Sequence, residues 1–297
     1  MPGPVFPDIP SKPPGPAELL RRHGLRPRKS LGQHFLRRPE AALRIVEAAA
    51  LPPHETVVEL GAGLGILTWA LSLRFRRVIA YELDEKLLSV LRKENFLPSR
   101  VEIRRGDILR LDYAALRREV GRPLILFGNL PYYLSSRLLY RLYELHELFE
   151  AAVFMFQREV AERLLASPGG KNYGLLSVLT SLLTEARRLM LLSPGEFYPP
   201  PEVASAVVKL VFRREFLPEG IFRLLKVAFS RRRKKLLRNL ATVWPEEAIR
   251  EAFRDLGLAE NIRAEAVGPE VYLELARRLE VHEPVQKGKK DLPGGSI

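Results

Sequence analysis

The stretch Val57-Val58-Glu59-Leu60-Gly61-Ala62-Gly63-Leu64-Gly65 decides how the rest of the chain is placed. Val57–Leu60 predicts a short buried strand, three alternate glycines follow, and an apolar helix pattern runs from Ile66 to Leu73. A strand, a tight glycine turn and a helix form a βα unit whose turn lets a ligand approach bare backbone. The spacing is G-x-G-x-G rather than the G-x-G-x-x-G of dinucleotide-binding proteins, and a plain tight turn is the alternative interpretation.

An acidic residue, Glu82, follows the next apolar strand, Arg77–Tyr81. Its distance along the chain from Gly61 is roughly the one at which Rossmann-type sites place a carboxylate on ribose hydroxyls. A carboxylate there suits an adenosine with free hydroxyls and would repel a 2′-phosphate. With Glu59 before the glycines and Glu82 after them, S-adenosylmethionine becomes the leading ligand.

From Thr56 onward, strand and helix patterns alternate. We predict strands at 56–60, 77–81, 101–104, 124–128 and 151–157, with helices near 66–73, 85–93, 112–119 and 135–146. This alternation predicts a parallel, doubly wound sheet whose strands end at one ligand-binding edge. Four positions directly follow a predicted strand: Gly61, Glu82, Asp107 and Asn129. Two more strands, 187–192 and 204–212, would complete the seven-stranded, mostly parallel sheet of a Rossmann-like methyltransferase.

Composition divides the chain into four segments. Residues 1–16 contain seven prolines and predict a flexible tail, and 283–297 are polar, Gly/Lys-rich and predicted to be disordered. Between them we expect a methyltransferase domain, 17–213, and a small all-α domain, 214–282. The helix patterns of the second domain cover 220–241, 245–256 and 267–279.

Length, composition and net charge limit the classes of protein to which the chain can belong. The 297 residues are 46% hydrophobic, enough for a full core, and the absence of cysteine excludes disulfides and Cys-based zinc sites. Lys and Arg outnumber Asp and Glu by 48 to 35, and the net charge of +13 favours a polyanionic partner, with a basic thermophile surface as the alternative. We find no metal-ligand spacing, no signal pattern and no membrane-length apolar run. We therefore expect a soluble, cytoplasmic monomer without a metal.

The sharpest motif is Asn129-Leu130-Pro131-Tyr132, which follows the fourth predicted strand. An exocyclic adenine amine is a poor nucleophile because its lone pair is delocalised into the ring, so it needs acceptors that localise that pair. Asn129 offers a side-chain oxygen and Leu130 a main-chain oxygen stiffened by the following proline. Tyr132 offers a stacking face, worth about 1–3 kcal/mol per base. The alternative is a structural turn capped by Asn129.

Two further residues have a functional and a structural interpretation. Asp107 follows the third strand and could accept a hydrogen bond from the adenine amine of a cofactor, or simply cap a turn. Phe197, in the Pro-rich segment 197–201, could be a second stacking face opposite Tyr132, or a loop aromatic that plugs the core.

A basic run, Arg231-Arg232-Arg233-Lys234-Lys235, lies inside the helix predicted for 220–241. Five consecutive cations surround much of a helix, and their mutual repulsion is tolerated best next to phosphates. The run therefore predicts nucleic-acid binding, with a solvated charged face as the alternative.

Taken together, these motifs resemble the rRNA adenine N6-dimethyltransferases, and most closely the small-subunit branch of that family. The resemblance covers about residues 17–280, and the stretches that carry it are 29–36, 59–65, Glu82, Asp107, 129–132, 197–205 and 228–237. It implies S-adenosylmethionine as cofactor and the small ribosomal subunit with its rRNA as partner. It also implies the transfer of two methyl groups to each of two adjacent adenosines near the 3′ end of that rRNA, in ribosome biogenesis.

The resemblance also assigns roles to individual residues. The family's cofactor contacts fall on His34, Leu36, Gly61, Glu82, Asp107 and Asn129, and its target-base residues on Asn129, Leu130, Tyr132 and Phe197. The position of His34 is often Asn in the family, so a contact that requires an amide would be lost here. That of Ala62 is often Pro, and the two tails are additions.

Three alternatives stay open. The first is a large-subunit rRNA adenine methyltransferase of the macrolide-resistance kind, against which the segment 197–205 and the chain length argue. The second is a nucleic-acid-binding factor that keeps the fold without turnover, against which the intact Asn129–Tyr132 motif argues. The third is a nicotinamide-dependent oxidoreductase, which the glycine spacing disfavours.

Overall fold

The computed structural model describes residues 11–28, 32–52, 56–231 and 233–280. The tail predicted for 283–297 and most of the one predicted for 1–16 lie outside these ranges. The chain forms two compact units. The first runs to Ala161 and takes up Glu185–Phe212, and the second combines Glu162–Thr184 with the residues from Arg213 on. Residues 162–184, which we expected in the methyltransferase domain, thus group by their contacts with the second unit.

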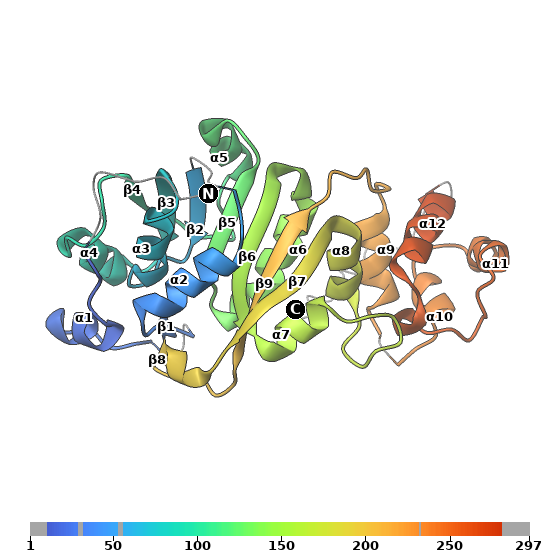
Figure 1. The fold of residues 1–297 in the computed structure, drawn as a ribbon. Coiled ribbons are helices and arrows are strands. Elements are labelled where there is room, and N and C mark those ends of the chain that lie inside the picture. The colour runs from blue at the N-terminus through green and yellow to red at the C-terminus, as the bar shows by residue number, and fades with distance from the viewer. Residues whose placement is uncertain (1–10, 29–31, 53–55, 232, 281–297) are drawn as a thin grey trace. The chain divides into compact units, whose positions relative to one another are not determined.

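A seven-stranded sheet in the order β4-β3-β2-β5-β6-β9-β7 is the centre of the first unit (Figure 1). Its strands are β2 (Thr56–Leu60), β3 (Arg77–Glu82), β4 (Val101–Arg105), β5 (Leu124–Asn129), β6 (Phe149–Gln157), β7 (Thr184–Leu192) and β9 (Ser205–Phe212). The pairs β3–β4, β2–β3, β2–β5 and β5–β6 are parallel, and β9 lies antiparallel to β6. The predicted seven-stranded, mostly parallel sheet is confirmed.

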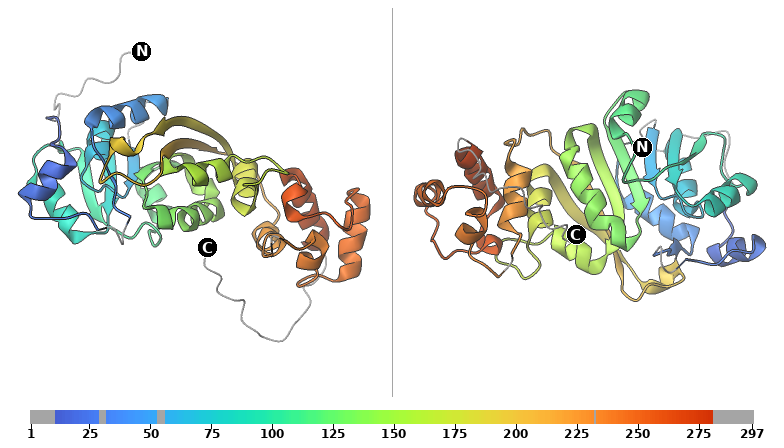
Figure 2. Two further views of the ribbon diagram at one scale, coloured as in Figure 1. Left: turned by 90° about the horizontal axis from the view of Figure 1, so that it is seen from below. Right: turned by 180° about the vertical axis from the view of Figure 1, so that it is seen from behind.

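The helices that precede or connect these strands are α1 (Pro16–Arg22), α2 (Pro39–Ala48), α3 (Ile66–Ser72), α4 (Glu85–Lys93), α5 (Tyr113–Val120), α6 (Ser135–Glu144) and α7 (Arg158–Leu164). The helices α2 and α3 pack together on one face, and α6 lies on the other (Figure 2). Because β2 lies inside the sheet and α3 is buried along its whole length, the glycine turn is held at both of its ends.

A short two-stranded ribbon joins segments that are far apart in the sequence. In it, β1 (Phe35–Leu36) pairs antiparallel with β8 (Phe197–Tyr198), with Leu36 opposite Phe197. The sequence analysis did not predict this pairing, because two-residue strands leave no periodic pattern. The ribbon brings the residues around His34 to the Pro-rich segment that begins at Phe197.

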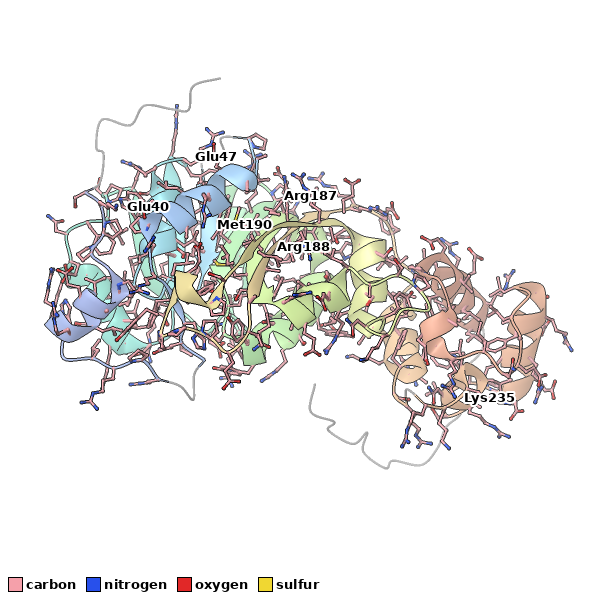
Figure 3. All side chains as sticks on the ribbon, turned by 60° about the horizontal axis from the view of Figure 1, so that its bottom comes forward. Glu40, Glu47, Arg187, Arg188, Met190 and Lys235 are labelled. Carbon is pink, nitrogen blue, oxygen red and sulfur yellow. The ribbon has the colours of Figure 1, made fainter. Side chains whose placement is uncertain are left out.

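The edge strand β7 carries charge on its exposed positions. Arg187 and Arg188 are both exposed there, and Figure 3 labels them on this strand. Charged side chains at a sheet edge discourage pairing with a strand of another molecule.

The second unit is helical, with α8 (Leu175–Leu183), α9 (Ile221–Ala228), α10 (Leu236–Leu240), α11 (Glu246–Asp255) and α12 (Pro269–Glu280). Phe229 packs between the rings of Tyr173 and Tyr272, whose hydroxyls donate to the carbonyls of Val267 and Ala264. In the described part of the chain, no helix combines the length and the apolar character that a membrane crossing needs.

The single helix predicted for 220–241 is wrong, because the chain leaves the helix after Ala228 and re-enters one at Leu236. The buried side chain of Asn239 explains the break: its Nδ2 donates to the carbonyls of Ala228, at 2.7 Å, and Arg231, at 3.2 Å. The first bond gives a partner to the carbonyl of the last residue of α9, and the second ties down the connection that follows it. The break also spares Arg231, Arg233, Lys234 and Lys235 from neighbouring positions on one helix.

Candidate functional site

A cavity of about 460 Å³ opens at the carboxyl edge of the sheet in the first unit. Gly61, Glu82, Asp107 and Asn129, each at or just after the end of a strand, all line it. His34 and Leu36 line it from the segment at β1. The structure therefore brings together all six positions that the resemblance assigned to the cofactor.

The floor of the cavity is the turn Gly61–Gly65. Its three glycines all have positive φ, at 82°, 58° and 80°, a region that side chains other than glycine rarely adopt. The amides of Gly61 and Ala62 both donate to the carbonyl of Tyr81, at 2.8 and 2.9 Å, which ties the turn to β3. A Cβ on Gly65 would lie 2.7 Å from Leu91 Cδ2, so packing as well as φ requires glycine there.

Glu82 joins the glycine turn to the end of β3. Its Oε2 accepts from the amide of Gly63 at 2.8 Å, and its Oε1 accepts from the amides of Leu83 and Asp84 at 2.7 and 2.9 Å. Burial raises the pKa of Glu82, and these amide bonds oppose the rise. Since a carboxylate offers about four acceptor positions, capacity for a ligand hydroxyl remains.

Glu59, the residue before the turn that the sequence singled out, is a buried acid. It is 1% exposed and lines the cavity, yet among the described residues its Oε2 has no hydrogen-bond partner. Burial raises the pKa of Glu59 to about 8, and the nearby charge of Glu82 adds to the rise. The Thr68 hydroxyl opposes the shift without reaching hydrogen-bond geometry. A buried acid with an unpaired oxygen at a cavity wall is typical of a ligand site.

The main chain of His34 fixes the orientation of the Asn129 side-chain amide. Its Nδ2 donates to the carbonyl of His34 at 2.7 Å. Because a carbonyl can only accept, the amide nitrogen must face His34, and Oδ1 is left as the acceptor. Leu130 and Pro131 also line the cavity, and Pro131 leads into a 3₁₀ turn, Tyr132–Leu134.

The ring of Tyr132 lies over the imidazole of His34, with centroids 5.6 Å apart and planes at 24°. Its hydroxyl exchanges a hydrogen bond of 2.9 Å with Ser205 Oγ, and burial raises the pKa of Tyr132. Both rings line the cavity.

Phe197 does not reach this cavity. It is 1% exposed and packs in the core, as the structural interpretation of the sequence expected. Tyr133 does line the cavity and is 55% exposed, although the sequence analysis did not select it. The only signal for Tyr133 was its place next to Tyr132.

Asp107 lines the cavity and also makes a local turn. Its Oδ1 accepts from the amide of Leu109 at 2.9 Å, so the turn-capping interpretation holds for that oxygen. Its Oδ2 lies 3.6 Å from Nε of Arg110, whose side chain is 87% exposed. Such an exposed pair contributes little, and Oδ2 stays accessible to a ligand.

The basic run of the sequence belongs to the second unit. The described residues Arg231, Arg233, Lys234 and Lys235 are all exposed on the connection from α9 to α10, and Arg232 lies outside the described residues. No carboxylate of the described chain lies within ion-pair distance of these four cations. Figure 3 shows Lys235 on the surface of this unit.

A doubly wound sheet with this strand order, a glycine turn after β2 and an acidic residue ending β3 define a Rossmann-like methyltransferase. The comparisons with known proteins narrow the class. A family model described as "Ribosomal RNA adenine dimethylase" matches residues 24–280. The chain therefore belongs to the ribosomal RNA adenine dimethylase family.

Individual relatives agree with this assignment. The chain is 39% identical over 272 residues to a "Ribosomal RNA small subunit methyltransferase A" of Syntrophus aciditrophicus, covering 88% of this chain and 97% of the relative. It is also similar to a dimethyladenosine transferase from Plasmodium falciparum, with a TM-score of 0.70 and 26% identity over 84% of this chain and 100% of that one. The 23S rRNA methyltransferase ErmE matches with a TM-score of 0.63 and 27% identity, over 83% and 99% of the two chains.

Proposed function

We propose that this protein uses S-adenosylmethionine to dimethylate N6 of two adjacent adenosines near the 3′ end of small-subunit rRNA during ribosome biogenesis. The observation that carries the proposal is the orientation of Asn129, whose Nδ2 is bound to the His34 carbonyl so that Oδ1 is left for the substrate. Asn129 lines the same cavity as Gly61, Ala62 and Gly63 of the glycine turn.

The cavity suits the proposed cofactor. Glu82 has acceptor capacity for ribose hydroxyls, Asp107 keeps Oδ2 for an adenine amine, and Glu59 offers an unpaired buried oxygen beside the glycine turn. When bound, S-adenosylmethionine supplies a methyl group that its sulfonium has already activated. The protein therefore needs to position two reactants and exclude water rather than to provide a strong base.

The reacting amine would be held by oxygens of the chain. Asn129 Oδ1 and the carbonyl of Leu130 accept its two N–H groups, which localises the nitrogen lone pair toward the methyl donor. As the N–C bond forms and the sulfonium–methyl bond breaks, the amine becomes cationic, these acceptors stabilise that charge, and one proton is then released to water. The monomethylated amine keeps one N–H for the second transfer. One ring face of Tyr132 then supports the base.

The substrate class follows from charge and from the relatives. The four exposed cations between α9 and α10 suit phosphates. Relatives named for the small-subunit rRNA support that RNA as the target, and the second unit is then an RNA-binding domain. We include in this proposal that the protein acts as a monomer in the cytoplasm, where ribosomal subunits are assembled.

The test is methyl transfer from radiolabelled S-adenosylmethionine to purified small subunits that lack the modification, followed by mapping of the labelled nucleotides. We expect label on two adjacent adenosines near the 3′ end, at about two methyl groups each. Large subunits, assayed in parallel, would be labelled instead if the activity were of the kind that the ErmE likeness suggests. Fully methylated small subunits serve as the matched control, and label on them would contradict the proposal.

A further inference from the structure

The His34 side chain connects two segments that approach the cavity from opposite ends of the sequence. Its Nδ1 lies 2.8 Å from the carbonyl oxygen of Pro199, in the segment after β8. Its ring stacks on Tyr132, in the segment after β5. The main chain of the same residue accepts from Asn129, so His34 fixes two of the groups that the proposed reaction uses.

The bond to Pro199 determines where the imidazole carries its proton. A carbonyl oxygen cannot donate, so Nδ1 must be the protonated nitrogen of the neutral ring. The lone pair then resides on Nε2. The Nδ1–H group is committed to Pro199 and is not available to a ligand.

Two contacts of the described chain orient the ring of Tyr132. His34 stacks on the phenol with an offset, and the bond to Ser205, which is fully buried, holds the hydroxyl end. The ring is therefore anchored by the imidazole and at its tip, and as a lining residue of the cavity it can support a base that enters there. Phe197 lies in the core and does not line this cavity.

We propose that the His34 side chain is a positioning residue for the target adenine, acting by holding Tyr132 and Pro199, and not a side-chain ligand of the methyl donor. The inference rests on the proposed function for the identity of the base. His34 then has two separate roles: its main-chain carbonyl orients Asn129, and its ring orients Tyr132. An asparagine here would keep a donor for Pro199 but offer no ring to stack.

The first test determines the tautomer of His34 in the absence of substrate. Long-range ¹H–¹⁵N correlations of histidine-labelled full-length protein distinguish the two neutral imidazole tautomers, and the protein has five histidines, so the His34→Asn variant assigns the signal. At a pH that keeps the ring neutral, we expect the Nδ1–H tautomer. The Nε2–H tautomer would overturn the inference whether or not the protein methylates rRNA.

The second test separates base positioning from cofactor binding. His34→Asn keeps the donor and loses the stack, His34→Phe keeps the stack and loses the donor, and His34→Ala loses both. We expect kcat on small subunits to fall in all three, by about 10- to 100-fold in His34→Ala. The calorimetric dissociation constant of S-adenosylmethionine should stay within about twofold.

His23→Asn is the matched control, because its ring also makes one bond, Nε2 to Glu94 at 2.8 Å, but lies outside the cavity. We expect unchanged kcat in this variant. If the three His34 variants instead weaken cofactor binding as much as they lower kcat/KM, the ring serves the cofactor and the inference fails. If wild-type protein transfers no methyl group, the proposed function fails. The tautomer measurement still tests the contact between His34 and Pro199.

Discussion

The cavity of the first unit and the basic connection of the second use polar groups in opposite ways. In the cavity, the orientations of Glu82, Asn129 and His34 are set by hydrogen bonds to main-chain atoms. In the connection, Arg231, Arg233, Lys234 and Lys235 are exposed, with no ion-pair partner in the described chain. The difference separates two tasks: chemistry needs atoms at fixed positions, whereas adhesion to a polyanion needs charge that can adapt.

Asn129→Ala tests the fixed region most directly. Loss of the oriented Oδ1 should lower kcat on small subunits by about 10²–10³, as the loss of one oriented group that stabilises developing charge does in other enzymes. The affinity for S-adenosylmethionine, measured by calorimetry, should change far less, because Gly61, Glu82 and Asp107 remain. Asn129→Asp is the informative companion, since it keeps an oxygen but loses the donor to His34. Near-normal turnover of the alanine variant would refute the role of Asn129.

Neutralising Arg231, Arg233, Lys234 and Lys235 to Gln tests the adaptable region. For every phosphate that the protein no longer neutralises, the slope of log K against log[salt] for RNA binding should fall by about 0.7–0.9. The four changes together should therefore lower it by up to about 3.6. Arg92, Lys93, Arg117 and Arg118, exposed near the ends of α4 and α5, provide a control set with the same change in charge. Equal slopes for the two sets would mean that only net charge matters.

Glu82→Ala sharpens the comparison inside the cavity. The carboxylate accepts from three amides, including that of Gly63, so its loss removes both a ligand contact and a brace of the glycine turn. We expect the dissociation constant for S-adenosylmethionine to rise by about 10- to 100-fold, an effect of about 1.4–2.7 kcal/mol. Calorimetry on the two proteins measures it directly. An unchanged constant would remove Glu82 from the cofactor site.

The sequence predicted well those elements whose local pattern of apolar and turn residues is compatible with only one type of structure. Gly61, Glu82, Asp107 and Asn129 lie at or just after the ends of strands that turns bound, and a parallel sheet must gather these ends at one edge. All four residues line the cavity in the structure. The seven-stranded, mostly parallel sheet followed from the same alternation, whereas the order of its strands comes from the structure.

The elements that the sequence missed depend on distant contacts. The break between α9 and α10 rests on Asn239, whose amide reaches back to Ala228 and Arg231. The ribbon of β1 and β8 pairs Leu36 with Phe197, and Phe197 lies in the core, whereas the resemblance assigned it to the target base. The contact of His34 with Tyr132 needs that same ribbon. None of these is visible in a window of neighbouring residues.

Glu59 should make stability depend on pH, with a change in the free energy of unfolding of at most about 1.4 kcal/mol per pH unit. Its pKa is raised from the ordinary 4.5 to about 8, so between these values the folded protein binds a proton that the unfolded chain has released. The contribution of Glu59 to stability is complete below pH 4.5 and is lost as the pH rises toward 8. Glu59→Gln cannot titrate, so its stability relative to wild type should increase across this window and level off above it.

Urea unfolding of both proteins from pH 5 to pH 9 measures this difference, and the comparison cancels groups that titrate alike in the two. Glu119→Gln is the control, because its ion pairs with Arg104 and Arg77 lower the pKa of Glu119 to about 2 and place its titration below the range measured. That variant should differ from wild type by a constant amount. Parallel curves for Glu59→Gln would mean that Glu59 is ionised at neutral pH. The cavity would then contain a buried negative charge without an ion-pair partner, which suits a cationic ligand. In that respect Glu59 would resemble the unpaired cations of the basic connection, although the other polar groups of the cavity are hydrogen-bonded.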